Sequence, residues 1–277
     1  MSVVGTTTDG ALEPAHEREL LERGEMELRG RIMPASNTTF FGSVTLAGVT
    51  LDCVYKPVSG ERPLWDFPDG TLAGREVAAY AVSEASGWDV VPTTVLRPDG
   101  PAGIGMVQAW REPDPEQDPV DLVSTSAVPE GYLHVLDAYD QHDRPVSLVH
   151  EDVDPLRRMA VLDIVLNNAD RKGGHVLAMP DGHRHGVDHG LAFNLDPKLR
   201  TVLWGWAGEP VHPEDAEVVR SLAEQLRSPA SALSAALHGL VLRDEIAATA
   251  LRCDLLLRRG RMPGPSGGRP SIPWPAF

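Results

Sequence analysis

An apolar run that ends in a tight polar loop, at residues 163–175, constrains this chain more than any other stretch. The run that starts at Asp163 leads into Asp170, and the loop after it reads Arg-Lys-Gly-Gly-His. A second acid, Asp188, follows a short apolar step and stands two residues before Gly190. Phosphoryl transfer requires one carboxylate that receives a proton and another that holds a divalent ion on phosphate oxygens. The two acids are therefore candidates for these two roles.

Three upstream motifs stand in the order found in a known family. They are Val54-Tyr-Lys-Pro57, Arg75-Glu-Val-Ala-Ala-Tyr80 and Val91-Pro-Thr-Thr-Val95. Together with the two loops, they resemble the phosphatidylinositol 3-/4-kinase superfamily, especially the type II 4-kinases and the HipA-type toxin kinases, across roughly residues 30–195. Those families use an Asp-Arg-x-x-x-Asn catalytic loop and a later Asp-x-Gly.

The resemblance implies an α+β, two-lobed protein-kinase-like fold of the PI3/PI4-kinase type. An antiparallel-sheet N-lobe at 16–112 would bind nucleotide, and a mainly helical C-lobe at 131–259 would carry the catalytic and metal loops. ATP would lie in the cleft between the lobes. The composition predicts a disordered lead at 1–15, an acidic proline-rich connection at 113–130 and a flexible tail at 260–277.

Hydrophobic periodicity predicts the order of the elements. Strands are expected at 26–32, 42–46, 48–57, 90–96, 105–110 and 146–150. Helices are expected at 17–23, 72–87, 154–167, 214–226 and 229–259.

Lys56 and Glu76 are the candidate residues for the nucleotide phosphates. The resemblance implies that the lysine contacts the α- and β-phosphates and pairs with the glutamate of the next helix. Without the resemblance, Lys56 would be a snorkelling edge residue and Glu76 a solvated one. Ser36, Asn37 and Thr38 lie in the preceding hairpin, where their donors suit phosphate oxygens. The alternative for this segment is an ordinary polar hairpin.

Met106, Gln108 and Trp110 are the candidate residues for the adenine base. In the superfamily, the strand that corresponds to 105–110 runs into the hinge between the lobes, where backbone groups bind adenine. The resemblance therefore implies that residues 106–110 line the base pocket.

Asp170 is the candidate catalytic base, which would accept the proton of the attacking hydroxyl. A loop aspartate beside Arg-Lys is otherwise a surface ion pair worth about 0–1 kcal/mol. Arg171 matches the arginine of the family and is expected to orient the loop, which Asn167 and Asn168 are placed to brace. Lys172 is expected to stabilise the γ-phosphate during transfer, with an ordinary exposed lysine as the equal alternative.

Asp188 is the candidate principal Mg²⁺ ligand, because the nearby glycine lets the backbone turn close to an ion. His175 departs from the family, since the superfamily has asparagine as second ligand at this position. Imidazole suits Mg²⁺ less well and favours Mn²⁺ or Zn²⁺. Three outcomes stay open: one ion held by Asp188 alone, His175 as second ligand to Mn²⁺ or Mg²⁺, or nucleotide binding with weak turnover.

Four histidines, at 175, 183, 185 and 189, crowd the same region. A zinc cluster would be expected to show a His-x₃-His pair on a helix or a Cys-x₂-Cys pair, and no predicted helix covers these histidines. Scattered surface histidines are the favoured interpretation.

The composition limits the partners of the chain. Its 277 residues are 42% hydrophobic, which suits one two-lobed domain or two small ones. A net charge of −15 argues against nucleic acid or an anionic membrane surface as the main partner. No apolar run approaches the roughly 20 residues of a membrane span. The two cysteines indicate a reducing, cytoplasmic location, and the high use of Ala, Arg, Gly and Pro is typical of a high-GC bacterium.

The sequence thus predicts an ATP- and divalent-metal-dependent kinase, a phosphotransferase that moves the γ-phosphate to a hydroxyl. Mg²⁺ is the expected ion and Mn²⁺ the second choice. The acidic composition ranks a protein, including the chain itself, or a soluble small molecule above phosphoinositides as acceptor. The alternatives are a nucleotide-binding pseudokinase that acts as a partner-binding module, a phosphoinositide lipid kinase, and nucleotidyl instead of phosphoryl transfer.

Overall fold

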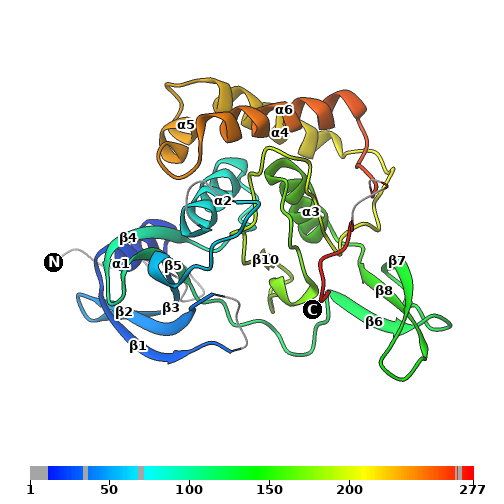
Figure 1. Cartoon of the computed structure of the whole chain (residues 1–277), viewed down its shortest axis with the longest axis horizontal. Coiled ribbons are helices and arrows are strands. Elements are labelled where there is room, and N and C mark those ends of the chain that lie inside the picture. The colour runs from blue at the N-terminus through cyan, green and yellow to red at the C-terminus, as the bar shows by residue number, and fades with distance from the viewer. Residues whose placement is uncertain (1–11, 34–36, 68–71, 266, 268–269) are drawn as a thin grey trace.

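A five-stranded antiparallel sheet forms the N-terminal part of the molecule, in the order β1-β2-β3-β5-β4 (Figure 1). The computed structural model describes residues 12–33, 37–67, 72–265, 267 and 270–277. The sheet is built from β1 (Glu25–Arg31), β2 (Phe40–Leu46), β3 (Val49–Pro57), β4 (Thr94–Gly100) and β5 (Gly103–Ala109), with α1 (Pro14–Arg23) before it and a short 3₁₀ turn η1 (Val58–Gly60) after β3.

The two faces of this sheet differ in what covers them. Side chains alternate along a strand, so Tyr55 and Val107, which are paired across β3 and β5, point to the same face. They pack there with Leu20 and Leu21 of α1 in a small core. Lys56 and its strand partner Met106 therefore lie on the opposite face, towards the rest of the molecule.

The C-terminal part combines helices with two smaller sheets (Figure 1). Three strands pair in the order β6-β8-β7, and two short strands, β9 and β10, form a hairpin near the middle of the molecule. Their bounds are β6 (Val120–Ser124), β7 (Tyr132–Tyr139), β8 (Pro145–Glu151), β9 (Val176–Ala178) and β10 (Arg184–Gly186). The helices are α3 (Asp154–Leu166), η2 (Gly173–His175), α4 (Pro213–Arg227), α5 (Ala232–Leu237) and α6 (Arg243–Arg259).

Helix α2 (Leu72–Ser86) lies between the large sheet and the helical part (Figure 1). Its first turn is capped by a side chain from the preceding loop, because the Glu61 carboxylate accepts from the backbone N–H groups of Leu72 and Ala73 at 3.0 and 2.8 Å. Buried Arg75 donates to the Ala192 carbonyl at 2.7 Å and pairs with Glu245 of α6 at 2.6 Å. These bonds fix α2 to the loop at Ala192 and to α6.

The prediction of antiparallel strands combined with helices is confirmed. The two-lobed, PI3/PI4-kinase-like arrangement and the limits of its lobes stay predictions. Among the helices of the described residues, none combines the length and the apolar character needed to cross a bilayer.

Two predicted segments differ from expectation, the connection at 113–130 and the helix at 229–259. The proline-rich connection 113–130 contains β6, and the stretch after it contains β7, both paired with β8. The pairing between distant segments, which no local pattern displays, makes these residues into strands. The expected helix at 229–259 is two helices, because Gly239 adopts a left-handed φ of 83° between α5 and α6.

The tail at 260–277 was expected to be flexible, whereas its described residues bond to the body of the protein. The Ser271 carbonyl accepts from the Thr201 amide at 3.0 Å and from the Trp204 indole at 2.9 Å. The Ala276 carbonyl accepts from the Gly173 amide at 2.8 Å. Although a proline-rich segment cannot form a helix, its carbonyls remain available as acceptors, and they anchor the tail here.

His150 joins β8 to the loop that carries Trp206. Its ring is fully buried and lies 4.3 Å from the indole of Trp206. Nε2 accepts from the Gly205 amide at 2.9 Å, so Nδ1 carries the proton and donates to the Glu151 carbonyl at 2.8 Å. Burial lowers the pKa of His150 to about 4, which keeps the ring neutral as this geometry requires.

We expect His150 to make the protein less stable as the pH falls from about 6.5 to about 4. In this window the unfolded chain binds a proton that the folded protein excludes, so the free energy of unfolding decreases by at most about 3 kcal/mol. Urea unfolding across this range should therefore show a smaller pH dependence for His150→Gln than for the wild type. His134→Gln, which changes an exposed histidine, is the control and should keep the pH dependence of the wild type. If His150→Gln also keeps the wild-type pH dependence, His150 is not the group responsible.

Candidate functional site

The ammonium group of Lys56 joins three segments that are far apart in the sequence. Nζ lies 2.7 Å from Glu76 Oε1 of α2 and 2.8 Å from Asp188 Oδ1 of the loop after β10. Glu76 is 2% exposed, whereas the side chain of Asp188 is 47% exposed. The pairing expected between Lys56 and Glu76 is present, and the same lysine also reaches the expected metal ligand.

Lys56, Glu76 and Asp188, here called the Lys56 junction, shift one another's pKa values. Burial opposes the charge of Lys56, but Asp188 and Glu76 outweigh it and raise the pKa of the lysine. The neighbouring ammonium group lowers the pKa of Asp188 well below its usual range. Burial raises the pKa of Glu76, and Lys56 opposes this shift. Asp188 is thus kept ionised, as a metal ligand must be.

A buried ion pair holds the loop that contains Asp170, the candidate catalytic base. Arg171 and Asp163 are both fully buried, with Nε–Oδ2 and Nη2–Oδ1 distances of 2.8 and 3.0 Å. Asn168 donates to the same carboxylate at 2.9 Å and accepts the Asp170 amide at 3.1 Å. Arg171 is thus linked through Asp163 and Asn168 to the backbone of Asp170, and its expected role in orienting the loop stays a prediction. Asp163 was not among the predicted site residues.

His189 connects this buried pair to the Lys56 junction, and sequence reasoning missed it. Its amide donates to Glu76 Oε2 at 2.8 Å, and its Nε2 lies 2.6 Å from Arg171 Nη2. Because arginine can only donate, Nε2 accepts, and burial lowers the pKa of the ring well below its usual value. The one sequence signal for His189 is its place between Asp188 and Gly190.

The tautomer of His175 leaves one nitrogen facing the candidate metal ligand. Nδ1 lies 2.9 Å from the backbone carbonyl of Asp170, which can only accept, so Nδ1 carries the proton. Nε2 then presents a lone pair to Asp188 Oδ2 at 3.3 Å. Burial lowers the pKa of His175 to about 4. A carbonyl-held Nδ1–H with a free Nε2 is typical of a metal-bound histidine.

Asp170 and Lys172 stand together beside this pair. The carboxylate Oδ2 lies 3.3 Å from Lys172 Nζ, and the two side chains are 24% and 20% exposed. Burial raises the pKa of Asp170, and Lys172 partly offsets the shift. A carboxylate with a raised pKa accepts a proton more readily, which suits a general base.

The three residues expected to line the adenine pocket lie on the same face of the large sheet as Lys56 but differ in exposure. Met106 is fully buried and Gln108 is 4% exposed, with its amide bonded to Thr94 Oγ1 at 2.8 Å. Trp110 packs edge-on against Phe41 with ring centroids 5.1 Å apart and keeps partial exposure. Of these three side chains, Trp110 presents the most surface to a ligand in this structure.

The expected phosphate hairpin is tied to the loop after β3. Asn37 Oδ1 accepts the Arg62 amide at 2.9 Å, and the Thr38 amide donates to the Gly60 carbonyl at 3.2 Å. Ser36 lies outside the described residues. Among the described residues, no hydrogen bond links Asn37 or Thr38 to Lys56, Glu76 or Asp188, and the expected contact of this hairpin with phosphate stays a prediction.

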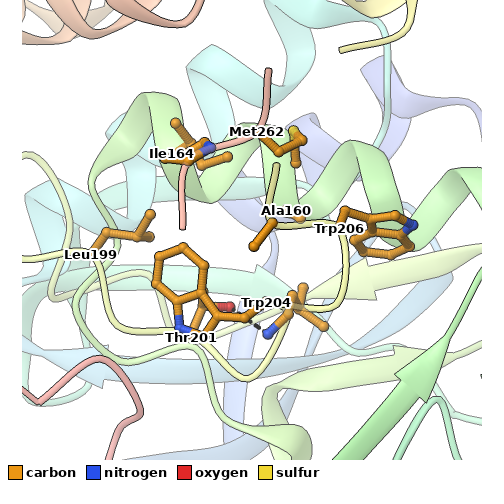
Figure 2. A pocket seen from close by; sticks show the side chains of 10 residues that line it. Ala160, Ile164, Leu199, Thr201, Trp204, Trp206 and Met262 are labelled. Atoms are coloured by element: carbon orange, nitrogen blue, oxygen red, sulfur yellow. Dashed lines mark hydrogen bonds between the residues drawn. The ribbon is translucent and has the colours of Figure 1, made fainter. Parts of the chain in front are cut away.

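Trp204 and Trp206 are both buried. Figure 2 shows them with Leu199, Ile164 of α3 and Met262 around a small apolar hollow. Its volume of about 10 Å³ has room for about one water molecule. The hollow is too small for a substrate, so packing is the role that the structure supports.

Comparison with known proteins relates the whole chain to one protein of similar length. No family model matches the sequence. Protein Rv2133c of Mycobacterium tuberculosis is 53% identical over 270 residues, which cover 94% of this chain and 95% of that protein. The chain belongs to the same family as Protein Rv2133c.

Other similarities are partial or distant. Phosphatidylinositol 4-kinase gamma 4 of Oryza sativa is 36% identical over 77 residues, and phosphatidylinositol 4-kinase gamma 3 of Arabidopsis thaliana is 37% identical over 79 residues. Each match covers 25% of this chain and 14% of the plant protein. The crystal structure of the Helicobacter pylori proinflammatory kinase CtkA aligns over 87% of the chain at 10% identity with a TM-score of 0.43. We infer no function from this structural similarity.

We expect Arg171→Met to destabilise the protein by about 3–5 kcal/mol, because it leaves the Asp163 carboxylate buried without a cation. Urea unfolding of Arg171→Met, Asp163→Leu and the double variant would measure this effect. The double variant should lose less stability than the sum of the two single variants.

Arg220→Met is the matched control, since Arg220 forms an exposed pair with Glu217 on α4 and should contribute within about 1 kcal/mol. Equal losses for Arg171→Met and Arg220→Met would contradict a supporting role for the buried pair.

Proposed function

We propose that the protein is an ATP- and divalent-metal-dependent kinase that transfers the γ-phosphate to a hydroxyl. The contact of Lys56 with both Glu76 and Asp188 carries the proposal. A lysine that touches a helix carboxylate and a metal-binding carboxylate is placed to hold nucleotide phosphates next to a divalent ion. The partial similarity to plant phosphatidylinositol 4-kinases supports the same class of reaction.

Asp188 and His175 fit a shared divalent ion. Two ligands bonded to one ion at about 2.1 Å, at angles of about 90–109°, lie about 3.0–3.4 Å apart. The Asp188 Oδ2–His175 Nε2 distance of 3.3 Å falls in this range. The carboxylate oxygen suits Mg²⁺ and the imidazole shifts the preference towards Mn²⁺. Such an ion would neutralise charge on the phosphate oxygens.

Asp170 is the proposed base of the reaction. The acceptor oxygen forms a bond to the γ-phosphorus, the bond from that phosphorus to the β–γ bridging oxygen breaks, and ADP leaves. Asp170 receives the proton of the acceptor hydroxyl. Lys172, now 3.3 Å from Asp170 Oδ2, would turn towards the γ-phosphate and stabilise its charge during transfer.

The acceptor is proposed to be a protein or a soluble small molecule. The net charge of −15 disfavours binding to an anionic membrane surface, so a phosphoinositide ranks below a soluble hydroxyl compound. Lys56 and Glu76 are proposed to hold the nucleotide phosphates, and the cytoplasm is the proposed location. The principal alternative is a pseudokinase that binds nucleotide without turnover, because His175 stands where the family has asparagine.

Incubation with γ-labelled ATP and either Mg²⁺ or Mn²⁺ tests the proposal, because water or a hydroxyl of the chain can serve as acceptor. We expect label on the protein or in free phosphate, and a loss of at least about 10²-fold in Asp170→Asn. Asp188→Asn should also lose the metal-dependent signal. Asp196→Asn, which changes an exposed acid of the same region, should stay active.

Three other results would each point away from the proposal. If the wild type and the variants bind ATP but none of them transfers label, the pseudokinase is favoured. Label transferred from α-labelled ATP would favour nucleotidyl transfer. Failure of the wild type to bind ATP would remove the basis for the whole assignment.

A further inference from the structure

A second group of metal-binding side chains lies outside the site described above. Asp89, His183 and His185 each offer one ligand atom, and these three atoms all lie within 4.8 Å of one another. Asp89 belongs to the loop after α2, whereas the histidines belong to the β9–β10 hairpin. The expectation of scattered surface histidines is wrong for His185 and His189, because both are buried. Asp89 was not among the predicted site residues, since it lies more than ninety residues before the histidines.

Backbone hydrogen bonds hold the two segments together. The Gly186 amide of β10 donates to the Val90 carbonyl at 2.7 Å. The Met179 amide donates to the His183 carbonyl at 2.9 Å and closes the turn of the hairpin. Asp89 adopts a left-handed φ of 51°, which aspartate tolerates better than most residues. The backbone positions of the three ligands are therefore fixed relative to one another.

His185 supplies the observation that points to a ligand. The residue is 5% exposed, and its Nδ1 is buried without a hydrogen-bond partner. Burial lowers the pKa of the ring to about 3, so it is neutral at physiological pH. A neutral, buried imidazole with an unused nitrogen costs free energy unless something binds there. Metal ions bind this neutral form of the ring.

The surrounding charge also favours a cation. The groups that act on Asp89 are the acids Glu17 and Asp181, Arg111 and the imidazole of His183. Arg111 is neutralised by its contact with Glu17 at 2.8 Å. With Arg111 paired in this way, the carboxylates of Asp89 and Asp181 leave an excess of negative charge beside the histidines.

We propose that Asp89, His183 and His185 bind a divalent transition-metal ion, for which Zn²⁺ is the best match. Two imidazoles and one carboxylate are ligands that zinc prefers over magnesium. Tetrahedral ligands lie about 3.3–3.5 Å apart, so no pair of ligand atoms must approach by more than about 1.5 Å. The Asp89 side chain, which is 74% exposed, is free to make this movement.

Binding through His183 changes one existing contact. Its Nε2 now lies 2.7 Å from the Asp89 backbone carbonyl, to which it donates. Coordination through Nε2 moves the ring proton to Nδ1 and replaces that hydrogen bond by a metal bond. The overall charge of the imidazole does not change in this step.

The bound ion would fasten the hairpin to the loop after α2. Strand β10 ends at Gly186, two residues before Asp188, and the Val187 amide donates to the His175 carbonyl at 3.0 Å. The ion bound by Asp89, His183 and His185 would therefore fix the backbone that carries Asp188 and His175, although neither of those two residues is its ligand. The ion is thus structural, and its binding does not depend on kinase activity.

Zinc titration of the metal-stripped full-length protein, with Mg²⁺ in large excess, tests this site. We expect the wild type to bind one Zn²⁺ per chain and His183→Gln and Asp89→Asn to bind it at least tenfold more weakly. Asp89→Asn keeps the proposal testable if the histidine variant fails to fold, because Asp89 is exposed. Substitution of Co²⁺ should give the visible absorption of a tetrahedral site in the wild type but not in His183→Gln or Asp89→Asn.

Two controls separate this site from other histidines. His142→Gln removes a comparable exposed His–Asp contact, with 4.0 Å between the ring and Asp140, and should leave zinc affinity unchanged. His175→Gln should also retain the zinc. The proposal is overturned if the wild type binds zinc no more tightly than His183→Gln, or if the bound ion is lost only in His175→Gln.

Discussion

The burial of the Glu76 carboxylate is the constraint on which the rest of the site depends. A carboxylate that is 2% exposed requires a cation and hydrogen-bond donors, because an unpaired charge in the interior costs several kcal/mol. Lys56 supplies the cation from β3, and the His189 amide supplies a donor from the loop after β10. The sheet, α2 and the Asp188 loop are therefore held at one point by charge, and the same lysine leaves Asp188 ionised and partly exposed.

A second buried charge pair sets the position of the loop that contains Asp170. Arg171 reaches Asp163 on α3 and the backbone carbonyls of His175 and Val187, so one side chain spans both functional loops. His189 bonds to Arg171 with its ring and to Glu76 with its amide. The two buried networks are thus continuous, and a change in either one is expected to move Asp170, His175 and Asp188 together.

The parts of this arrangement that local sequence could predict are those set by short spacing. The apolar strand that Pro57 ends placed Lys56 near a strand end, and Gly190 marked the turn after Asp188. Spacing alone indicated a solvated Glu76, which is instead buried. Contacts between distant segments could not be predicted in this way. The Asp89–His183 contact and the bond from Gly173 to Ala276 join residues that lie about a hundred positions apart. The bonds of Ser271 and Ala276 to the body of the protein could not be predicted for the same reason, since composition indicates helix or no helix but does not indicate what a carbonyl bonds to.

The central claim is that Asp188 and His175 together hold the divalent ion that serves the nucleotide. Pulsed electron paramagnetic resonance of the complex with Mn²⁺ and ATP tests it most directly, because a directly bonded ¹⁴N modulates the manganese signal. We predict this modulation in the wild type and its loss in His175→Asn, the variant that introduces the asparagine expected at this position from the resemblance to phosphatidylinositol kinases. Identical spectra for the two proteins would contradict the claim and would leave Asp188 as the one protein ligand that the site analysis supports.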